Sequence, residues 1–129
     1  MLFNIYDYVN PQGENEFKIW TEEQQKAQRA KLNQKIDMLE QHGDELPPNL
    51  LTDSGTPGIK KLRIKGNVQL RPLLCKGPVD VHSEYTLLMG AMEKGDKWVP
   101  KAAPDIANDR KQAVIADPNN RRKKHERVD

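Results

Sequence analysis

Residues 60–94 constrain the fold of this chain most strongly, because turn residues divide them into short runs of β-forming residues. The runs with strand character span residues 59–64, 68–75 and 85–93. Runs of this length, joined through Gly, Pro and Asn, are typical of a small antiparallel sheet. We expect residues 76–84, opened by Gly77-Pro78, to form a hairpin loop. Pro72 cannot donate a ladder hydrogen bond, so the second strand is expected to lie at an edge or to bulge there.

The N-terminal part mixes strand and helix patterns. Residues 2–9 are rich in aromatic and β-branched types and predict a first strand, although the frayed end of a helix fits them as well. Residues 14–20 predict a short helix, because Phe17 and Trp20 lie three positions apart and share one face.

A longer helix is expected over residues 22–42. Thr21 and Gln24 have the spacing of a capping box, and Gly43 is suited to end the helix with a positive φ. A loop is then expected over residues 43–58, which are rich in Pro, Gly, Ser and Asp.

The C-terminal part is expected to hold one more helix. Pro100 and Pro104 bracket its start, its buried face would carry Ile106, Ala113 and Val114, and it would end near Asp117. At 129 residues the chain predicts one α+β domain over residues 1–118, followed by a mobile basic tail over residues 119–129.

Charge is distributed unevenly along the chain. Residues 1–50 carry five Lys and Arg against nine Asp and Glu, whereas residues 51–129 carry sixteen against ten. A basic half of this kind is the electrostatic pattern expected of a protein that binds a polyanion, although a solvated charged face has the same composition.

Several classes of site and location are disfavoured by the sequence. Cys75 is the only cysteine, which excludes an intrachain disulfide and argues against a cysteine-ligated metal. His42, His82 and His125 show no paired ligand spacing, so we predict neither a metal nor a cofactor. No apolar run reaches the length of a membrane span and no signal-peptide pattern opens the chain, which predicts a cytoplasmic protein without a membrane partner.

A set of short motifs follows one another in a characteristic order. The first helical region carries Phe17, Trp20, Ala30, Ile36, Leu39 and Gly43. The basic and apolar elements that follow are Lys61-Leu62-Arg63 with Gly66, then Gln69-Leu70-Arg71, then Leu87 to Lys94, and then Pro100 or Pro104. In this order and spacing the chain resembles the RelE/HigB superfamily of bacterial and phage toxins, within it the phage-derived RelE-like branch.

The resemblance implies a fold and an activity. The fold is a small antiparallel sheet packed by two N-terminal helices and a C-terminal helix. The activity is that of a type II toxin: metal-independent cleavage of mRNA on the ribosome, by attack of a ribose 2′-hydroxyl on the adjacent phosphate. The partners it implies are mRNA, the ribosome and a cognate antitoxin protein, with no small-molecule cofactor.

Candidate catalytic residues follow from that chemistry, which needs cations on the phosphate together with an acid and a base. Arg71 offers two parallel donors to a phosphate, and Lys94 would add a second cation. Glu93, His82 and His125 are the acid and base candidates. Arg71 could instead be a strand arginine facing solvent, and Glu93 an ion-pair partner of Lys94.

The candidate nucleic-acid-binding residues are basic, with one aromatic for base stacking. They are Lys60, Lys61, Arg63, Lys65, Trp98, Arg121, Arg122, Lys123 and Lys124.

The chain departs from the family pattern at Glu93, where a lysine is usual, and at Gln69, where a glutamate is usual. These departures favour an alternative: a non-catalytic nucleic-acid-binding or ribosome-binding protein of phage origin with the same fold. A ParE-like inhibitor of a topoisomerase is a further alternative.

Overall fold

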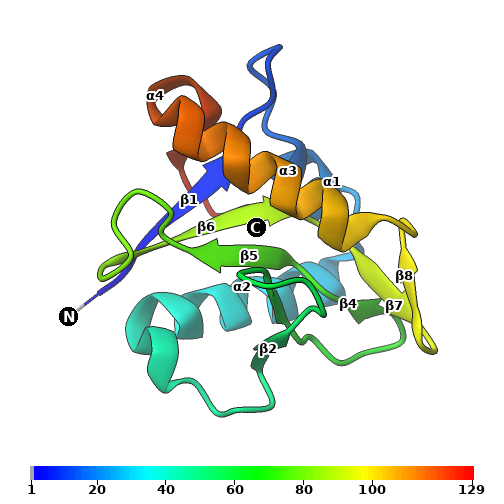
Figure 1. Cartoon of the computed structure of the whole chain (residues 1–129). Helices are drawn as coiled ribbons and strands as arrows, with labels where there is room; N and C mark the ends of the chain where they lie inside the picture. Colours follow the sequence, from blue (N-terminus) through cyan, green and yellow to red (C-terminus); the bar gives the residue numbers. More distant parts are fainter. Residues whose placement is uncertain (1) are drawn as a thin grey trace.

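A computed structural model describes residues 2–129 (Figure 1). Its elements, in chain order, are β1 (Asn4–Tyr8), α1 (Glu16–Glu22), α2 (Lys26–His42), the 3-10 turn η1 (Gly43–Glu45), β2 (Leu51–Asp53), β3 (Lys60–Leu62), β4 (Gln69–Leu70), β5 (Leu73–Lys76), β6 (Glu84–Met89), β7 (Met92–Lys94), β8 (Lys97–Val99), α3 (Ala103–Ala116), α4 (Pro118–Arg121) and β9 (Arg122–Lys124).

The main sheet is mixed rather than antiparallel. Over residues 2–129 it has six strands in the order β2-β3-β5-β6-β1-β9. β1 and β6 pair in parallel, from Asn4 opposite Glu84 to Asp7 opposite Leu87, and the other neighbours pair antiparallel. The α+β class is therefore confirmed, but the expectation of an antiparallel sheet is wrong at its centre. Parallel pairing needs a long crossover, and the chain between β1 and β6 supplies one.

Helices cover both faces of this sheet. α1 and α2 pack on one face through Phe17, Leu32, Ile36 and Leu39, and α3 packs on the other through Ala103, Ala107 and Val114. Figure 1 shows α3 crossing in front of the strands and α2 on the far side. Small residues on α3 let that helix approach the sheet closely.

Two breaks divide the strands predicted over residues 68–75 and 85–93. Pro72 separates β4 from β5, and Gly90 separates β6 from β7. At Gly90 a Cβ atom would lie 1.9 Å from the Trp20 ring, so the position accepts only glycine without rearrangement. The fragments β4 and β7, together with β8, form a second, smaller sheet.

The helix boundary predicted at Glu22 is wrong by four residues. Thr21 lies inside α1, where its hydroxyl donates to the Phe17 carbonyl (2.9 Å) instead of capping the next helix. α2 begins at Lys26. Its C-terminus is as predicted, because Gly43 follows with φ 52°.

The C-terminal segment is built into the fold. β9 pairs antiparallel with β1, and beyond it the Asn33 side-chain amide donates to the Val128 carbonyl (2.7 Å). The structure therefore corrects the expectation of a mobile tail. Without β9, the strand β1 would be an unpaired edge of the sheet, and the C-terminal segment covers that edge.

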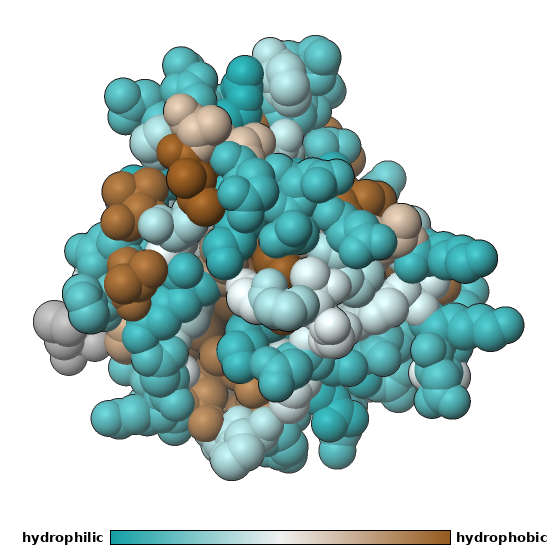
Figure 2. Space-filling model, viewed as in Figure 1, coloured by the Kyte–Doolittle hydropathy of each residue, from teal (hydrophilic) through white to brown (hydrophobic). Residues whose placement is uncertain are grey.

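Figure 2 shows that hydrophilic residues dominate the face seen in Figure 1. None of the helices between residues 2 and 129 has both the length and the apolar character needed to cross a bilayer.

Candidate nucleic-acid interface

Arg71 is a buried arginine whose donors are already used. Its side chain is only 5% exposed. Its Nε donates to Glu93 Oε1 (2.8 Å) and its Nη2 to Gln69 Oε1 (2.7 Å). Its Nη1 donates to the Ile64 and Leu70 carbonyls, at 3.2 and 2.9 Å. Four of the five N–H groups of this guanidinium are used in this way, so Arg71 offers no free donor pair to a phosphate.

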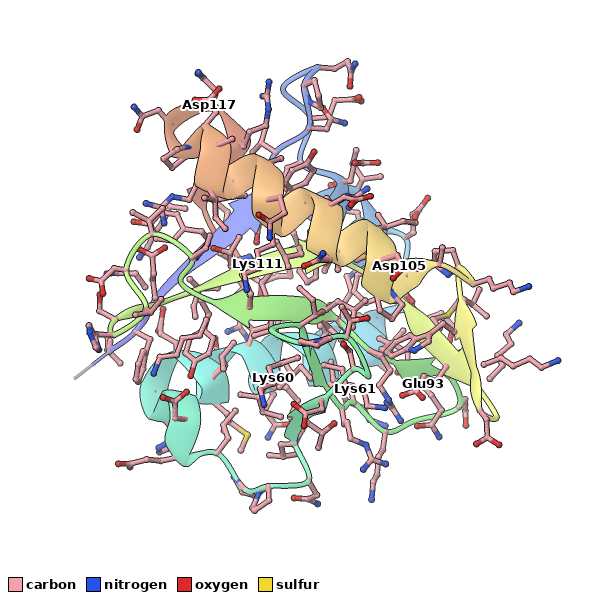
Figure 3. All side chains as sticks on the ribbon, in the orientation of Figure 1. Lys60, Lys61, Glu93, Asp105, Lys111 and Asp117 are labelled. Atoms are coloured by element: carbon pink, nitrogen blue, oxygen red, sulfur yellow. The ribbon has the colours of Figure 1, made fainter. Side chains whose placement is uncertain are left out.

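Glu93 is the anion at the centre of this network. Its Oε1 also accepts a hydrogen bond from Lys61 Nζ (2.8 Å), and Figure 3 shows Lys61 and Glu93 next to each other. Burial disfavours the charged form of Glu93, but the hydrogen bonds from Lys61 and Arg71 outweigh burial, so the pKa of Glu93 lies below its usual range. A carboxylate held ionised by two cations is a poor general base near neutral pH.

Trp98 and Lys94 flank this network on β8 and β7. Trp98 lies opposite Glu93 in the small sheet, and Lys61 Nζ lies 5.3 Å from its ring centroid. Because neighbouring side chains in a strand point to opposite faces, Glu93 faces Arg71 and Lys94 faces away from it. The structure therefore brings Arg71, Glu93, Lys61 and Trp98 together, but it does not bring Lys94 to Arg71.

His82 lies far from this network. It is exposed in the loop between β5 and β6, where its backbone N–H donates to Asp80 Oδ1 (2.9 Å). The network lies at the other end of β6, a strand of six residues that spans about 20 Å. The four candidate catalytic residues consequently do not form one site.

The basic cluster at residues 60–65 divides into two groups. Lys60 forms an ion pair with Asp53 (2.7 Å) and Lys61 one with Glu93. Arg63 and Lys65 belong to neither pair; both line a groove between α2 and the segment that follows β3.

We call this cavity the basic groove. It has a volume of about 290 Å³, and its lining residues are Lys31, Gln34, Lys35, Asn49, Leu50, Arg63, Ile64 and Lys65. The lining set includes no carboxylate, and within the described residues none of its four cations forms an ion pair. The Nε of Arg63 is buried, and residues 2–129 supply no hydrogen-bond partner for it.

One helix and one turn position these cations. Lys31 and Lys35 are four residues apart on α2 and so project from one side of the helix, while Leu32, Ile36 and Leu39 face the core. On the other wall, the Arg63 N–H donates to the Leu50 carbonyl (2.8 Å), which ties the Arg63 backbone to the turn before β2.

Sequence reasoning missed Lys31, Lys35, Gln34 and Asn49. A signal was present, because α2 carries Lys or Arg at positions 26, 29, 31 and 35 and no acidic residue before Asp37. What the sequence did not show is that this half of the helix lies beside Arg63 and Lys65.

The basic residues of the C-terminal segment are mostly engaged. Arg122 forms an ion pair with Glu84 and its guanidinium lies 3.9 Å from the Tyr6 ring centroid. Lys124 donates to Asn4 Oδ1 (2.8 Å) and Arg121 to the Asn120 carbonyl (3.0 Å). Lys123 is exposed.

His125 belongs to a second cluster, on the same face of the sheet as α2. Its Nδ1 lies 2.8 Å from Oδ1 of Asp7, a carboxylate that is only 1% exposed. The other Asp7 oxygen accepts from Asn15 Nδ2 (2.8 Å). In the tautomer with its proton on Nδ1, His125 donates to this carboxylate and leaves Nε2 as the ring nitrogen able to accept a proton. His125 also lines a cavity of about 120 Å³ with Lys124 and Arg127.

Within residues 2–129, no three or more His, Cys, Asp or Glu side chains gather where they would hold a metal ion. The thiol of Cys75 is buried, and burial raises its pKa to about 12, which makes it an apolar core residue rather than a nucleophile.

No family model, curated protein or solved structure matches this chain.

Proposed function

We propose that this protein binds single-stranded RNA through the basic groove. The observation that carries the proposal is the set of four cations, Lys31, Lys35, Arg63 and Lys65, which line one cavity without a carboxylate among the lining residues. Like charges gathered in this way repel one another and lower the stability of the folded state. An anionic ligand removes that repulsion, so the arrangement favours binding over stability.

The contrast with the neighbouring lysines supports this reading. Lys60 and Lys61 belong to the same basic run of sequence, yet each is neutralised by a carboxylate, Asp53 or Glu93. The fold therefore supplies anions for the first half of the run and leaves the second half to an external partner. A polyanion such as a nucleic-acid backbone is the chemistry that matches several closely spaced cations.

The dimensions of the groove favour a single strand. A cavity of about 290 Å³ is at the small end of ligand-sized pockets and is bounded by α2 on one side and the Asn49 to Leu50 turn on the other. A duplex binds over a broad exposed surface, whereas single-stranded RNA inserts unstacked bases into pockets of this kind.

The binding experiment compares two double variants of equal charge change. Lys35→Gln/Lys65→Gln removes one cation from each wall of the groove, and the control Lys101→Gln/Lys111→Gln removes two from the layer of α3, where Figure 3 labels Lys111. Each exposed lysine and phosphate pair is worth on the order of 0.5 to 1 kcal/mol, so the groove variant should bind a fluorescent RNA oligonucleotide about tenfold more weakly.

Fluorescence anisotropy measures both affinities. If the control variant loses as much affinity as the groove variant, binding is a property of net charge alone and the groove is not the site.

A second candidate function is cleavage of mRNA by a RelE-like toxin. We propose this because the Asp7 and His125 pair has the geometry of a general base held by a carboxylate, and His125 lines a cavity with Lys124, which forms no ion pair within residues 2–129. The His125 Nε2 would take the proton of a ribose 2′-hydroxyl as that oxygen attacks phosphorus. The bond to the 5′-oxygen then breaks, and the leaving oxygen takes a proton from water.

In this candidate function the sheet, the two N-terminal helices and α3 form a RelE-like fold, and a cognate antitoxin restrains the toxin. An acidic antitoxin segment laid across the basic groove would compete with RNA for the same cations.

Cleavage is tested by incubating the protein with translating ribosomes and mapping mRNA 5′ ends. The expected result is new ends with the unaltered chain, lost in His125→Gln and in Asp7→Asn, and retained in His82→Gln, which changes an exposed loop histidine. An unchanged cleavage map beside an active toxin control contradicts the nuclease function and leaves RNA binding as the function.

A further inference from the structure

We infer that the basic groove accepts one unstacked nucleotide and discriminates between the four bases, an inference that rests on the proposed RNA binding. The groove is not a uniformly charged surface. Its lining combines cations with the apolar side chains of Leu50 and Ile64 and with the neutral amides of Gln34 and Asn49. A phosphate-binding surface alone has no need of the apolar residues, and it uses amides only as donors.

The cations account for the backbone of the bound strand. Lys31 and Lys35 come from α2, and Arg63 and Lys65 come from the facing segment, so positive charge lies on both walls. A strand that runs along the groove can place the phosphates on either side of one nucleotide against these walls.

The apolar residues account for the base. Leu50 is half-buried and gives the groove apolar surface, and Ile64, which is fully buried, packs behind the lining. Arg63 adds a planar guanidinium on which a base can stack, and its buried Nε has no hydrogen-bond partner within the described chain. The Nε–H bond lies in the plane of the guanidinium, so an oxygen of the bound strand at the edge of the group can accept from it while a base stacks on the face.

The two amides account for discrimination. Gln34 projects from α2 and Asn49 from the turn before β2, and both side chains are exposed at the groove. Across residues 2–129 neither side-chain amide has a hydrogen-bond partner. An amide presents an acceptor and two donors, the pattern that reads the edge of a base, whereas a phosphate can use only the donors.

The test measures binding of the full chain to each of the four nucleoside 5′-monophosphates and to inorganic phosphate, by titration followed with NMR. We expect the four nucleotides to differ by about tenfold between the tightest and the weakest, because the amides favour some base edges over others. The side-chain amide signals of Gln34 and Asn49 should shift with the preferred nucleotide and stay unchanged with phosphate.

The variants Gln34→Ala and Asn49→Ala separate base reading from charge. Each should reduce the difference in affinity among the four nucleotides severalfold and weaken binding of inorganic phosphate by less than about twofold, because no cation is removed. Gln41→Ala is the matched control, since Gln41 is an exposed amide of the same helix outside the groove.

Equal affinities for all four nucleotides overturn this inference. A difference in affinity among the nucleotides that persists in both amide variants overturns it as well. If RNA oligonucleotides still bind with the salt dependence of a polyanion in that case, the proposed RNA binding stands and only base discrimination fails. If neither RNA nor nucleotides bind, both proposals fail.

Discussion

At the scale of single residues, two arginines on one segment have opposite environments. Arg71 is surrounded by acceptors, from Glu93, Gln69 and two backbone carbonyls. Arg63 retains a buried Nε with no partner among residues 2–129. The sequence motif favoured Arg71 as the arginine that binds a phosphate. In the structure Arg71 is already hydrogen-bonded, whereas Arg63 has a donor without a partner among residues 2–129. The difference depends on Glu93, which lies 22 residues from Arg71 along the chain.

Arg71 is therefore predicted to act on stability rather than on binding. Replacing Arg71 with Met leaves Glu93 with one cation and removes the bonds to the Ile64 and Leu70 carbonyls. Removal of one partner from a buried ion pair costs about 3 kcal/mol of unfolding free energy. Urea unfolding measures this loss, and anisotropy under folding conditions should show unchanged RNA affinity. Loss of RNA binding at full stability would place Arg71 in the binding site instead.

Glu93 is predicted to make stability depend on pH at acidic pH. The folded-state pKa of Glu93 lies below the unfolded value of about 4.3, so its contribution is present above that pH and is lost as pH falls through the folded pKa. The difference in unfolding free energy between the unaltered chain and Glu93→Gln should be constant from about pH 7 to 5 and shrink below about pH 4. If this difference in unfolding free energy grew as the pH fell, the pKa of Glu93 would be raised in the folded state, contrary to the prediction.

At the scale of elements, β9 is the part of the fold that the sequence described least well. Its residues are almost all charged, a composition that indicates a solvated tail. The structure instead pairs β9 with β1 and buries the contact between Arg122 and Glu84, whose side chains are 15% and 6% exposed.

The variant Arg122→Ala tests whether β9 is an integral strand. It leaves the Glu84 carboxylate buried without its cation and removes the guanidinium from the Tyr6 ring. We expect a loss of about 3 kcal/mol in unfolding free energy. Lys123→Ala is the control, because Lys123 is the exposed neighbour on the same strand and its replacement should change stability by less than about 0.5 kcal/mol. Equal effects of the two variants on stability would mean that the contact between Arg122 and Glu84 does not stabilise β9.

Local sequence signals predicted the elements whose causes are local. The hairpin over residues 76–84, the end of α2 at Gly43 and the proline-initiated α3 are all present, because turn chemistry and backbone φ act within a few residues. The break at Gly90 was missed, since its cause is the Trp20 ring, which is distant in the sequence. The parallel pairing of β1 with β6 was missed for the same reason.

In the candidate site, too, single residues were predicted from the sequence but contacts between distant segments were not. Lys61 was singled out from sequence as a nucleic-acid-binding residue and Glu93 as a catalytic one, but their mutual ion pair could not be foreseen, and it neutralises both. Arg63 and Lys65 were also predicted, whereas Lys31 and Lys35 became visible only once α2 was placed beside them.

At the scale of the whole molecule, the charge asymmetry of the sequence is not the asymmetry of the surface. The first 50 residues are acidic on balance, yet they contribute the basic half of α2 to the groove. Seven of the sixteen cations of the basic second half, including Lys60, Lys61 and Arg122, form ion pairs within residues 2–129. Net charge by segment consequently did not predict where the cations without an internal ion pair gather.

The salt dependence of RNA binding tests the central claim most directly. For a single strand, the logarithm of the binding constant falls with the logarithm of salt concentration by about 0.7 for each phosphate contacted, so four groove cations predict a slope of about −3. Neutralising Lys35 and Lys65 with glutamine should reduce its magnitude to about 1.4, while Lys101→Gln/Lys111→Gln should leave it near −3. A slope that is the same in all three proteins would contradict the assignment of RNA binding to the basic groove.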